Sequence, residues 1–183
     1  MEAIGSWLLL EPGPEIGTEV EKMIDATSMK ILQILQEKAR IPNVEVARQL
    51  EMAPSAVLER IRKLERQQII DGYEVRLNPE QFNRRQVAFI QVLTAAGADH
   101  SRLGEACAAI AEVQEVHYVA GEDSFLLKVR VADTRELGHL LQKRLAALPG
   151  VKSTRTSTVL HTYKESAKLP LSDPSVTTNG PSK

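Results

Sequence analysis

The chain has 183 residues, of which 43% are hydrophobic and 26% are charged, and its formal net charge is −1. This composition is typical of a globular protein of one or two domains, and no apolar run approaches the roughly 18 residues of a membrane span. The single cysteine excludes a disulfide framework and a multi-cysteine zinc site, and it indicates a reducing compartment. The near-neutral charge argues at first against nucleic acid as a partner, because DNA-binding domains usually carry a basic face.

The charge is unevenly distributed along the chain. Residues 1–25 carry six acids and one base, whereas residues 26–79 have a net charge of +2. Residues 1–23 have no periodic apolar pattern after their first short patch, and we expect a flexible extension there. Residues 166–183 are rich in Ser, Thr and Pro and are expected to form a disordered tail. Two patterned regions, residues 24–79 and 80–165, lie between these ends.

The first patterned region predicts three short helices. Apolar residues recur at helical spacing around Ile31–Leu35 and Val44–Leu50, and a third helix is expected from Pro54 to Ile70. The expected N-caps of the first two helices are Asp25 or Thr27, and Asn43. A brief turn between the last two helices predicts a helix-turn-helix. Asp71-Gly72 is a hairpin signal that would add a wing, with strands at Ile69–Ile70 and Tyr73–Leu77.

The second region alternates strands and helices. The strands are expected at Gln86–Thr94, Val116–Ala120, Phe125–Val131 and Val151–Tyr163. One helical stripe runs from Leu103 to Ile110, and a second runs from Leu137 to Leu148 after a helix-entry cap at Asp133. The order β-α-β-β-α-β predicts a ferredoxin-like domain, so the fold class is α+β with a winged helix-turn-helix in front.

The third helix carries the pattern that is most informative about function. Its apolar residues gather on one side, and its polar residues gather on the opposite side. Such a face suits a DNA recognition helix, whose N-terminal residues meet base edges while Arg and Lys meet phosphates. A solvated charged face is the alternative interpretation. The candidate DNA-binding residues are Ser55, Ala56 and Glu59 for bases, and Arg60, Arg62, Lys63 and Arg66 for phosphates.

Four motifs occur in order between Ile24 and Lys164. They are I-D-x-x-S-x-x-I-L from Ile24, L-E-R-I-R-K-L-E from Leu58, I-D-G-Y from Ile70 followed by L-N-P, and L-P-G-V from Leu148 followed by T-R-T. Together they resemble the Lrp/AsnC (feast/famine, leucine-responsive) family of transcription regulators. Ser28 stands where that family usually has a second Asp. Ala53 stands where Ser usually precedes the recognition helix, which weakens the helix cap by about 1 kcal/mol.

The resemblance implies a DNA-binding domain joined to a ligand-binding and oligomerising domain. It implies dimers that pair through their sheets and assemble to tetramers or octamers, with an amino acid bound between dimers. It also implies a prokaryotic, cytoplasmic, nucleoid-associated protein. Its partners would be double-stranded DNA and an amino-acid effector, without a membrane and without a cofactor.

The turn Gly121-Glu122-Asp123-Ser124 resembles the family's effector loop, which is usually G-D-x-D. Ser124 replaces the usual second Asp, and the acidic Asp123 stands where an apolar or aromatic residue is common. Backbone N–H groups at a glycine turn can hold a carboxylate, and a side-chain acid can pair with an α-ammonium. The threonines Thr154 and Thr156 are expected on one face of the last strand, where they could complete the pocket. A hairpin turn with two solvated acids is the alternative interpretation.

Other chemistry has little support in the sequence. The four histidines lack metal-ligand spacing, and Cys107 lies on an apolar stripe, so no catalytic or metal-binding residue is predicted. We therefore expect a sequence-specific regulator whose assembly or DNA affinity responds to an amino acid. The alternative is a small-molecule sensor or assembly module with weak or lost DNA binding. An enzyme on this fold is a third class, and no catalytic constellation supports it.

Overall fold

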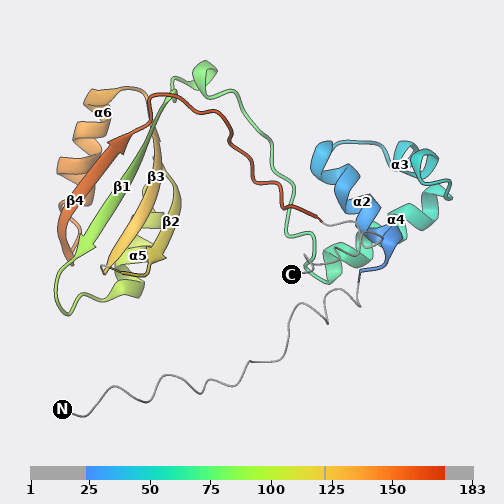
Figure 1. Ribbon diagram of the computed structural model, residues 1–183, viewed down its shortest axis with the longest axis horizontal. Helices are drawn as coiled ribbons and strands as arrows, with labels where there is room; N and C mark the ends of the chain where they lie inside the picture. The colour runs from blue at the N-terminus through green and yellow to red at the C-terminus, as the bar shows by residue number, and fades with distance from the viewer. Residues whose placement is uncertain (1–23, 122, 172–183) are drawn as a thin grey trace, which may run out of the picture. The chain divides into compact units, whose positions relative to one another are not determined.

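The computed structural model describes residues 24–121 and 123–171. The described residues divide into two compact units: residues 24–75 together with 166–171, and residues 76–165 (Figure 1). The chain therefore passes between the units twice. The extension predicted for residues 1–23 and the tail predicted for residues 172–183 lie outside the described residues.

The first unit is a bundle of three helices. They are α2 (Ala26–Glu37), α3 (Asn43–Gln49) and α4 (Pro54–Arg66). Ile31, Val46, Val57 and Leu64 pack together in its core with at most 2% exposure, because these residues recur at helical spacing on the inner faces. The short turn between α3 and α4 confirms the helix-turn-helix. Asp25 caps α2 as predicted by accepting a hydrogen bond from the Ser28 backbone N–H at 2.7 Å.

The predicted wing is wrong. The third helix of this unit was predicted to reach Ile70, but α4 ends at Arg66. Residues 67–78, which were predicted to hold the wing, contain no strand. Gln68 adopts a left-handed backbone with φ +55°, and the Ile69 N–H bonds back to the Leu64 carbonyl at 2.9 Å. This closing pattern turns Ile69 and Ile70 onto the helical core. They are then unavailable as the first strand of a hairpin.

The predicted N-cap of α3 is also wrong. Asn43 is the first residue of the helix, and Pro42 occupies the cap position without a side-chain hydrogen bond. At its other end α3 closes at Glu51, which has φ +52°, and the Met52 N–H donates to the Ala47 carbonyl at 2.9 Å. Glycine is the residue that usually fills such a left-handed position, so the sequence did not mark this turn.

The second unit is a four-stranded antiparallel sheet with helices on one face (Figure 1). Its strands are β1 (Gln86–Thr94), β2 (Val113–Val119), β3 (Ser124–Val131) and β4 (Val151–Thr158). Its helices are α5 (His100–Ala108) and α6 (Thr134–His139), and α6 continues as a π-helical segment over Leu140–Leu145. The sheet order β2-β3-β1-β4 confirms the predicted ferredoxin-like domain. The last strand is shorter than predicted and ends at Thr158 rather than Tyr163.

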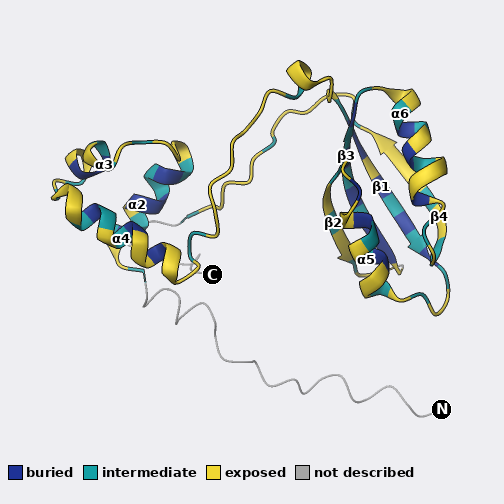
Figure 2. Cartoon of the chain, turned by 180° about the vertical axis from the view of Figure 1, so that it is seen from behind, coloured by how far each residue is buried: buried dark blue, intermediate teal, exposed yellow. Residues whose placement is uncertain are grey.

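The core of this unit lies between the sheet and its helices (Figure 2). Ile90, Leu127 and Leu145 are fully buried there, together with Cys107 on α5. Burial raises the pKa of the Cys107 thiol. The opposite face of the sheet is left without a helix, and Phe89 is 39% exposed on it.

A short C-terminal segment belongs to the helical unit. The composition predicts disorder from Ser166, but residues 166–171 follow a defined course, and Leu171 packs against the core of the three helices. The first six residues of the predicted tail therefore differ from the prediction.

Candidate DNA-binding and effector sites

The outer face of α4 carries the polar residues that were predicted from the sequence to bind DNA. Val57, Ile61 and Leu64 point into the core. The exposed residues are Ser55, Glu59, Arg62, Lys63 and Arg66, and Ala56 is partly exposed beside them. Because Ala53 caps the helix without a side-chain acceptor, the first turn of α4 lacks the usual capping hydrogen bond. The face offers three cations along one helix and small residues at its N-terminal end.

One acid on this face is paired with one of its cations. The Glu59 carboxylate lies 3.5 Å from the Arg66 guanidinium, and both side chains are more than 60% exposed. Exposed pairs of this kind contribute little to stability, so either partner is free to rearrange. The Glu59 carboxylate and the Arg66 guanidinium are therefore both accessible from solvent.

Arg60 has a different environment from the other cations of α4. Its guanidinium donates to the Asp25 carboxylate at 2.5 Å and to the Ser28 hydroxyl at 3.1 Å, so it ties α4 to the start of α2. The capping hydrogen bond from Ser28 and the hydrogen bond from Arg60 lower the pKa of Asp25 to about 2. Arg60 thus positions the helix through Asp25, and its role toward phosphate stays a prediction.

The Gly121–Ser124 turn joins β2 to β3. Gly121 has φ +116°, a conformation that favours glycine. The Asp123 carbonyl accepts hydrogen bonds from the Thr94 N–H at 3.0 Å and the Thr94 hydroxyl at 3.1 Å. The Tyr118 hydroxyl donates to the Asp123 carboxylate at 3.1 Å. These contacts hold the acid of the turn in place, while Glu122, also predicted for the site, lies outside the described residues.

Ser124 differs from its neighbour because it is fully buried. Its hydroxyl accepts a hydrogen bond from the Gln91 side chain at 3.2 Å, and its backbone pairs with Leu93. The Ser124 hydroxyl is therefore inaccessible from solvent, whereas the Asp123 residue is exposed.

An open groove adjoins the turn, and the sequence did not indicate it. It has a volume of about 510 Å³ and lies along α5 and β2. His100, Tyr118 and Phe125 form an aromatic cluster in its wall, with ring centroids 4.9 Å apart for His100 and Tyr118 and 5.1 Å for Tyr118 and Phe125. The remaining lining residues are Ser101, Gly104, Glu105, Ala108 and Val116. The groove places an apolar and aromatic surface beside the carboxylate of Asp123.

The two threonines of β4 do share a face, as predicted. Thr154 pairs with Val92 and Thr156 with Ile90, so both lie on the side of the sheet that carries the helices. Strand β1 separates them from β3 and from the turn. Since neighbouring strands are about 4.8 Å apart, two strand spacings put β4 roughly 10 Å from β3. Within one chain the threonines and the turn are therefore not brought together.

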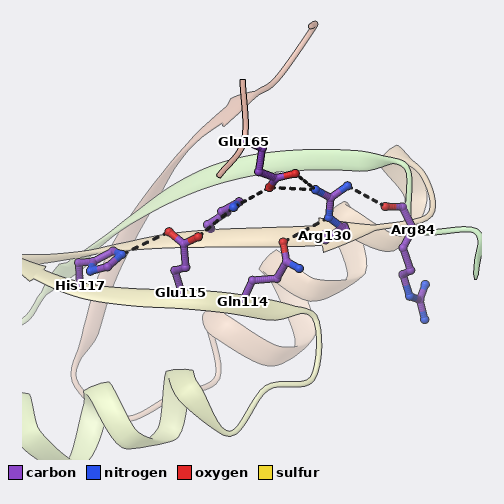
Figure 3. A network of polar contacts seen from close by, with 7 residues as sticks. Arg84, Gln114, Glu115, His117, Arg130 and Glu165 are labelled. Atoms are coloured by element: carbon purple, nitrogen blue, oxygen red, sulfur yellow. Dashed lines mark hydrogen bonds and ion pairs between the residues drawn. The ribbon is translucent and has the colours of Figure 1, made fainter. Parts of the chain in front are cut away.

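The face of the sheet without helices carries a network of charges (Figure 3). Arg130 donates to Glu165 at 2.9 Å and to Gln114 at 3.2 Å, and Lys128 lies 2.6 Å from Glu165 and 2.8 Å from Glu115. Partial burial opposes the charge on Lys128, but its hydrogen bonds to the two acids outweigh burial and raise its pKa. The charges on this face thus compensate one another beside the half-exposed Phe89.

The structure also bears on other kinds of site. Among residues 24–121 and 123–171, no three metal-ligating side chains gather in a group that could hold a metal ion. No helix in the described part of the chain is long and apolar enough to cross a bilayer.

Comparison with known proteins identifies both units. Residues 24–65 match the AsnC-type helix-turn-helix domain, and residues 87–169 match the Lrp/AsnC ligand binding domain. The leucine-responsive regulatory protein of Haemophilus influenzae is 36% identical over 82% of this chain and 92% of its own length. The protein of the same name from Escherichia coli K12 is 37% identical over 81% of this chain and 92% of its own length.

Solved structures agree with this assignment. A transcriptional regulator from Neisseria meningitidis, in complex with L-methionine, superposes with a TM-score of 0.77 at 32% identity and covers 80% of this chain and 96% of its own. The feast or famine regulatory protein of M. tuberculosis, complexed with L-methionine, superposes with a TM-score of 0.73 at 29% identity and covers 80% of this chain and 98% of its own.

These relatives are transcription regulators rather than enzymes, and the matches to both domains give no support to a sensor that has lost DNA binding. The chain belongs to the Lrp/AsnC family of DNA-binding transcription regulators, with a helix-turn-helix unit for DNA that is followed along the sequence by an amino-acid-binding unit.

Proposed function

We propose that this regulator binds DNA through the outer face of α4, as a homo-oligomer, and that an amino acid bound near Asp123 changes its assembly or its DNA affinity. The exposed cations of α4 carry the first part of the proposal. Two such helices in a dimer would enter successive major grooves of a pseudo-palindromic site. A protein of this kind would act on the chromosome in the prokaryotic cytoplasm.

The roles on α4 follow from its exposure pattern. Arg62, Lys63 and Arg66 would neutralise phosphates, while Ser55 and Ala56 at the start of the helix would meet base edges. Glu59 could accept a hydrogen bond from cytosine N4 once it leaves Arg66. Arg60 is assigned mainly to positioning, because Asp25 and Ser28 already engage its guanidinium.

The effector site is built around the fixed turn and the groove beside it. The Asp123 carboxylate would pair with the α-ammonium of an amino acid, and the glycine turn would offer backbone N–H groups to its carboxylate. Phe125 and Val116 would receive an apolar side chain. Relatives named for leucine and neighbours that hold L-methionine both support an amino acid with an apolar side chain.

The modest charge of one subunit and the sheet face without helices support the proposed oligomerisation. A net charge of +2 over residues 26–79 supports only weak binding by a single helix-turn-helix, so paired subunits gain from avidity. Phe89 is exposed on that face beside charges that are already paired within the chain, and a two-fold dimer would bury it against the same face of a second copy. Thr154 and Thr156 could then contribute to a site completed by another subunit.

The test is a gel shift on the DNA upstream of the protein's own gene, with and without each common amino acid. We expect a specific shift at moderate salt whose affinity or stoichiometry changes with leucine or methionine. Calorimetry and light scattering on the same samples measure ligand binding and mass separately. Absence of any shift would refute the DNA role, and absence of heat with every amino acid would refute the effector role alone.

A further inference from the structure

The C-terminal segment lies against α2, where one side chain of the helix holds its backbone. The Leu169 N–H donates to the Gln36 side-chain oxygen at 2.8 Å, and the Gln36 side-chain nitrogen donates to the Leu169 carbonyl at 3.3 Å. One side-chain amide therefore satisfies both polar groups of a single backbone residue. This fixes the position of the segment along the helix.

Two flanking contacts extend the docking. Leu171 packs against the core of the three helices, and the Lys168 ammonium lies 2.7 Å from the Glu37 carboxylate. The ion pair is exposed and contributes little, whereas the leucine covers apolar core surface. The segment thus forms part of the wall of the DNA-binding unit, although it lies about a hundred residues beyond α4 in the sequence.

The same segment begins at an anchor on the other unit. The Glu165 carboxylate meets Arg130 at 2.9 Å and Lys128 at 2.6 Å, and the side chains of these two bases are only 14% and 16% exposed. Hydrogen bonds from Lys128 and the charge of Arg130 lower the pKa of Glu165. Glu165 is held on β3, and Leu169 is held on α2.

The interval between these anchors is short. Four residue steps separate Glu165 from Leu169, and an extended chain spans at most about 14 Å over that interval. The other connection runs from Ile70, the last residue packed in the helical core, to Gln86 at the start of β1. Its sixteen steps span at most about 55 Å. The C-terminal connection is therefore the tighter of the two.

We propose that residues Glu165–Leu171 form a strap with two roles. It closes the core of the DNA-binding unit at α2, and its short length limits how far α4 can move from the sheet of the ligand-binding unit. A change at the sheet face that releases Glu165 would lengthen the tether and widen the range of half-site positions that α4 can reach. Only this last consequence rests on the proposed DNA-binding function.

The docking role is tested by hydrogen–deuterium exchange on full-length protein and two truncations. A chain that ends at Glu165 loses the strap, and a chain that ends at Leu171 keeps it and serves as the matched control. We expect exchange in α2 peptides to rise at least tenfold in the first truncation and to match the full-length protein in the second. Equal α2 exchange in both truncations would overturn the docking role.

Point variants keep this test decisive should the shorter chain fail to fold. Gln36→Ala removes both hydrogen bonds to Leu169, and Gln33→Ala makes the same change one turn earlier on α2. We expect faster exchange of the Leu169 amide in Gln36→Ala only. Similar exchange in the two variants would show that the segment is not held by Gln36.

The tether role is tested by double electron–electron resonance, which measures the distance between nitroxide labels at Lys30→Cys and Arg135→Cys, one on each unit. Labelled subunits are diluted with unlabelled protein, so that distances within one chain dominate. Inserting Gly-Ser-Gly-Ser between Ser166 and Ala167 should widen the distance distribution, whereas the same insertion between Asn78 and Pro79 should change it little. An unchanged distribution after the first insertion would overturn the tether role, whether or not the protein binds DNA.

Discussion

The two candidate sites differ in how they are assembled. The DNA-binding face comes from one helix, so its members from Ser55 to Arg66 share a surface through helical periodicity alone. The effector site joins a turn to Thr94 at the end of β1, Tyr118 on β2 and a groove along α5. A site on one helix can be read from sequence spacing, whereas a site built across strands depends on register and neighbours. Substitutions confined to one site should therefore affect either DNA binding or amino-acid binding, and not both.

The largest effect is expected on the helix face. Arg62→Ala combined with Arg66→Ala should lower affinity for all DNA sequences about 10- to 100-fold and should reduce the dependence of binding on salt, because each lost phosphate contact removes about 0.9 from the salt slope. Titration of DNA in fluorescence anisotropy at several salt concentrations measures both quantities. Arg135→Ala, on α6, is the control for loss of charge elsewhere. Wild-type affinity in the double variant would remove α4 from the proposed DNA interface.

The effector turn should show a smaller effect of a different kind. Asp123→Asn removes the charge that would pair with an α-ammonium, and we expect amino-acid affinity to fall about tenfold, the value of one charge-assisted hydrogen bond. Calorimetry measures this loss. Glu105→Gln, which removes an acid from the groove wall, is the matched control. An equal loss in both variants would indicate a general charge effect rather than a contact at Asp123.

Stability of the helix-turn-helix should respond to its left-handed turn. Glu51→Gly relieves the strain of φ +52° at the end of α3, so the free energy of unfolding should rise by about 0.5–1 kcal/mol. Gln49→Gly, two residues earlier at the last residue of α3, should lower it by about 0.5 kcal/mol. Urea titration followed by circular dichroism compares the two. Destabilisation by both glycines would contradict the assignment of strain to Glu51.

The smallest effect concerns the ion pair between α2 and α4. Asp25→Asn keeps an N-cap but removes the charge opposite Arg60, so it should cost about 0.5 kcal/mol near neutral pH. The pKa of Asp25 is lowered to about 2 in the folded protein, so its contribution is complete above about pH 4 and is lost as the pH falls toward 2. Unfolding curves of wild type and variant should therefore converge over that range. A constant difference down to pH 2 would contradict the ion pair.

Several parts of the fold could be predicted because their signals are local. The strand Gln86–Thr94 has the predicted bounds, and the start of α4 at Pro54 follows from the preference of proline for the first helical turn. The prediction of a wing was wrong because Gln68 adopts a left-handed backbone, and no glycine stands at that position to indicate it. The composition beyond Ser166 predicted disorder. It could not reveal that Leu169 docks on Gln36, because Gln36 lies far away in the sequence.

The candidate sites show the same division. Exposure of Arg62, Lys63 and Arg66 follows from the helical wheel. Engagement of Arg60 by Asp25 required the packing of α4 on α2, which no local pattern gives. The partners of Asp123 lie on β1 and β2, and only the sheet register brings Thr94 and Tyr118 to that turn.

The single cysteine has a practical consequence. Cys107 is fully buried in the ligand-binding unit, and this burial raises the pKa of its thiol. Thiol reagents should therefore react with the native protein only when that unit opens. The rate at which Cys107 is labelled therefore reports how often the unit opens, and mass spectrometry measures it without any engineered probe. An amino acid that rigidifies the unit should lower this labelling rate even where it leaves the mass of the assembly unchanged.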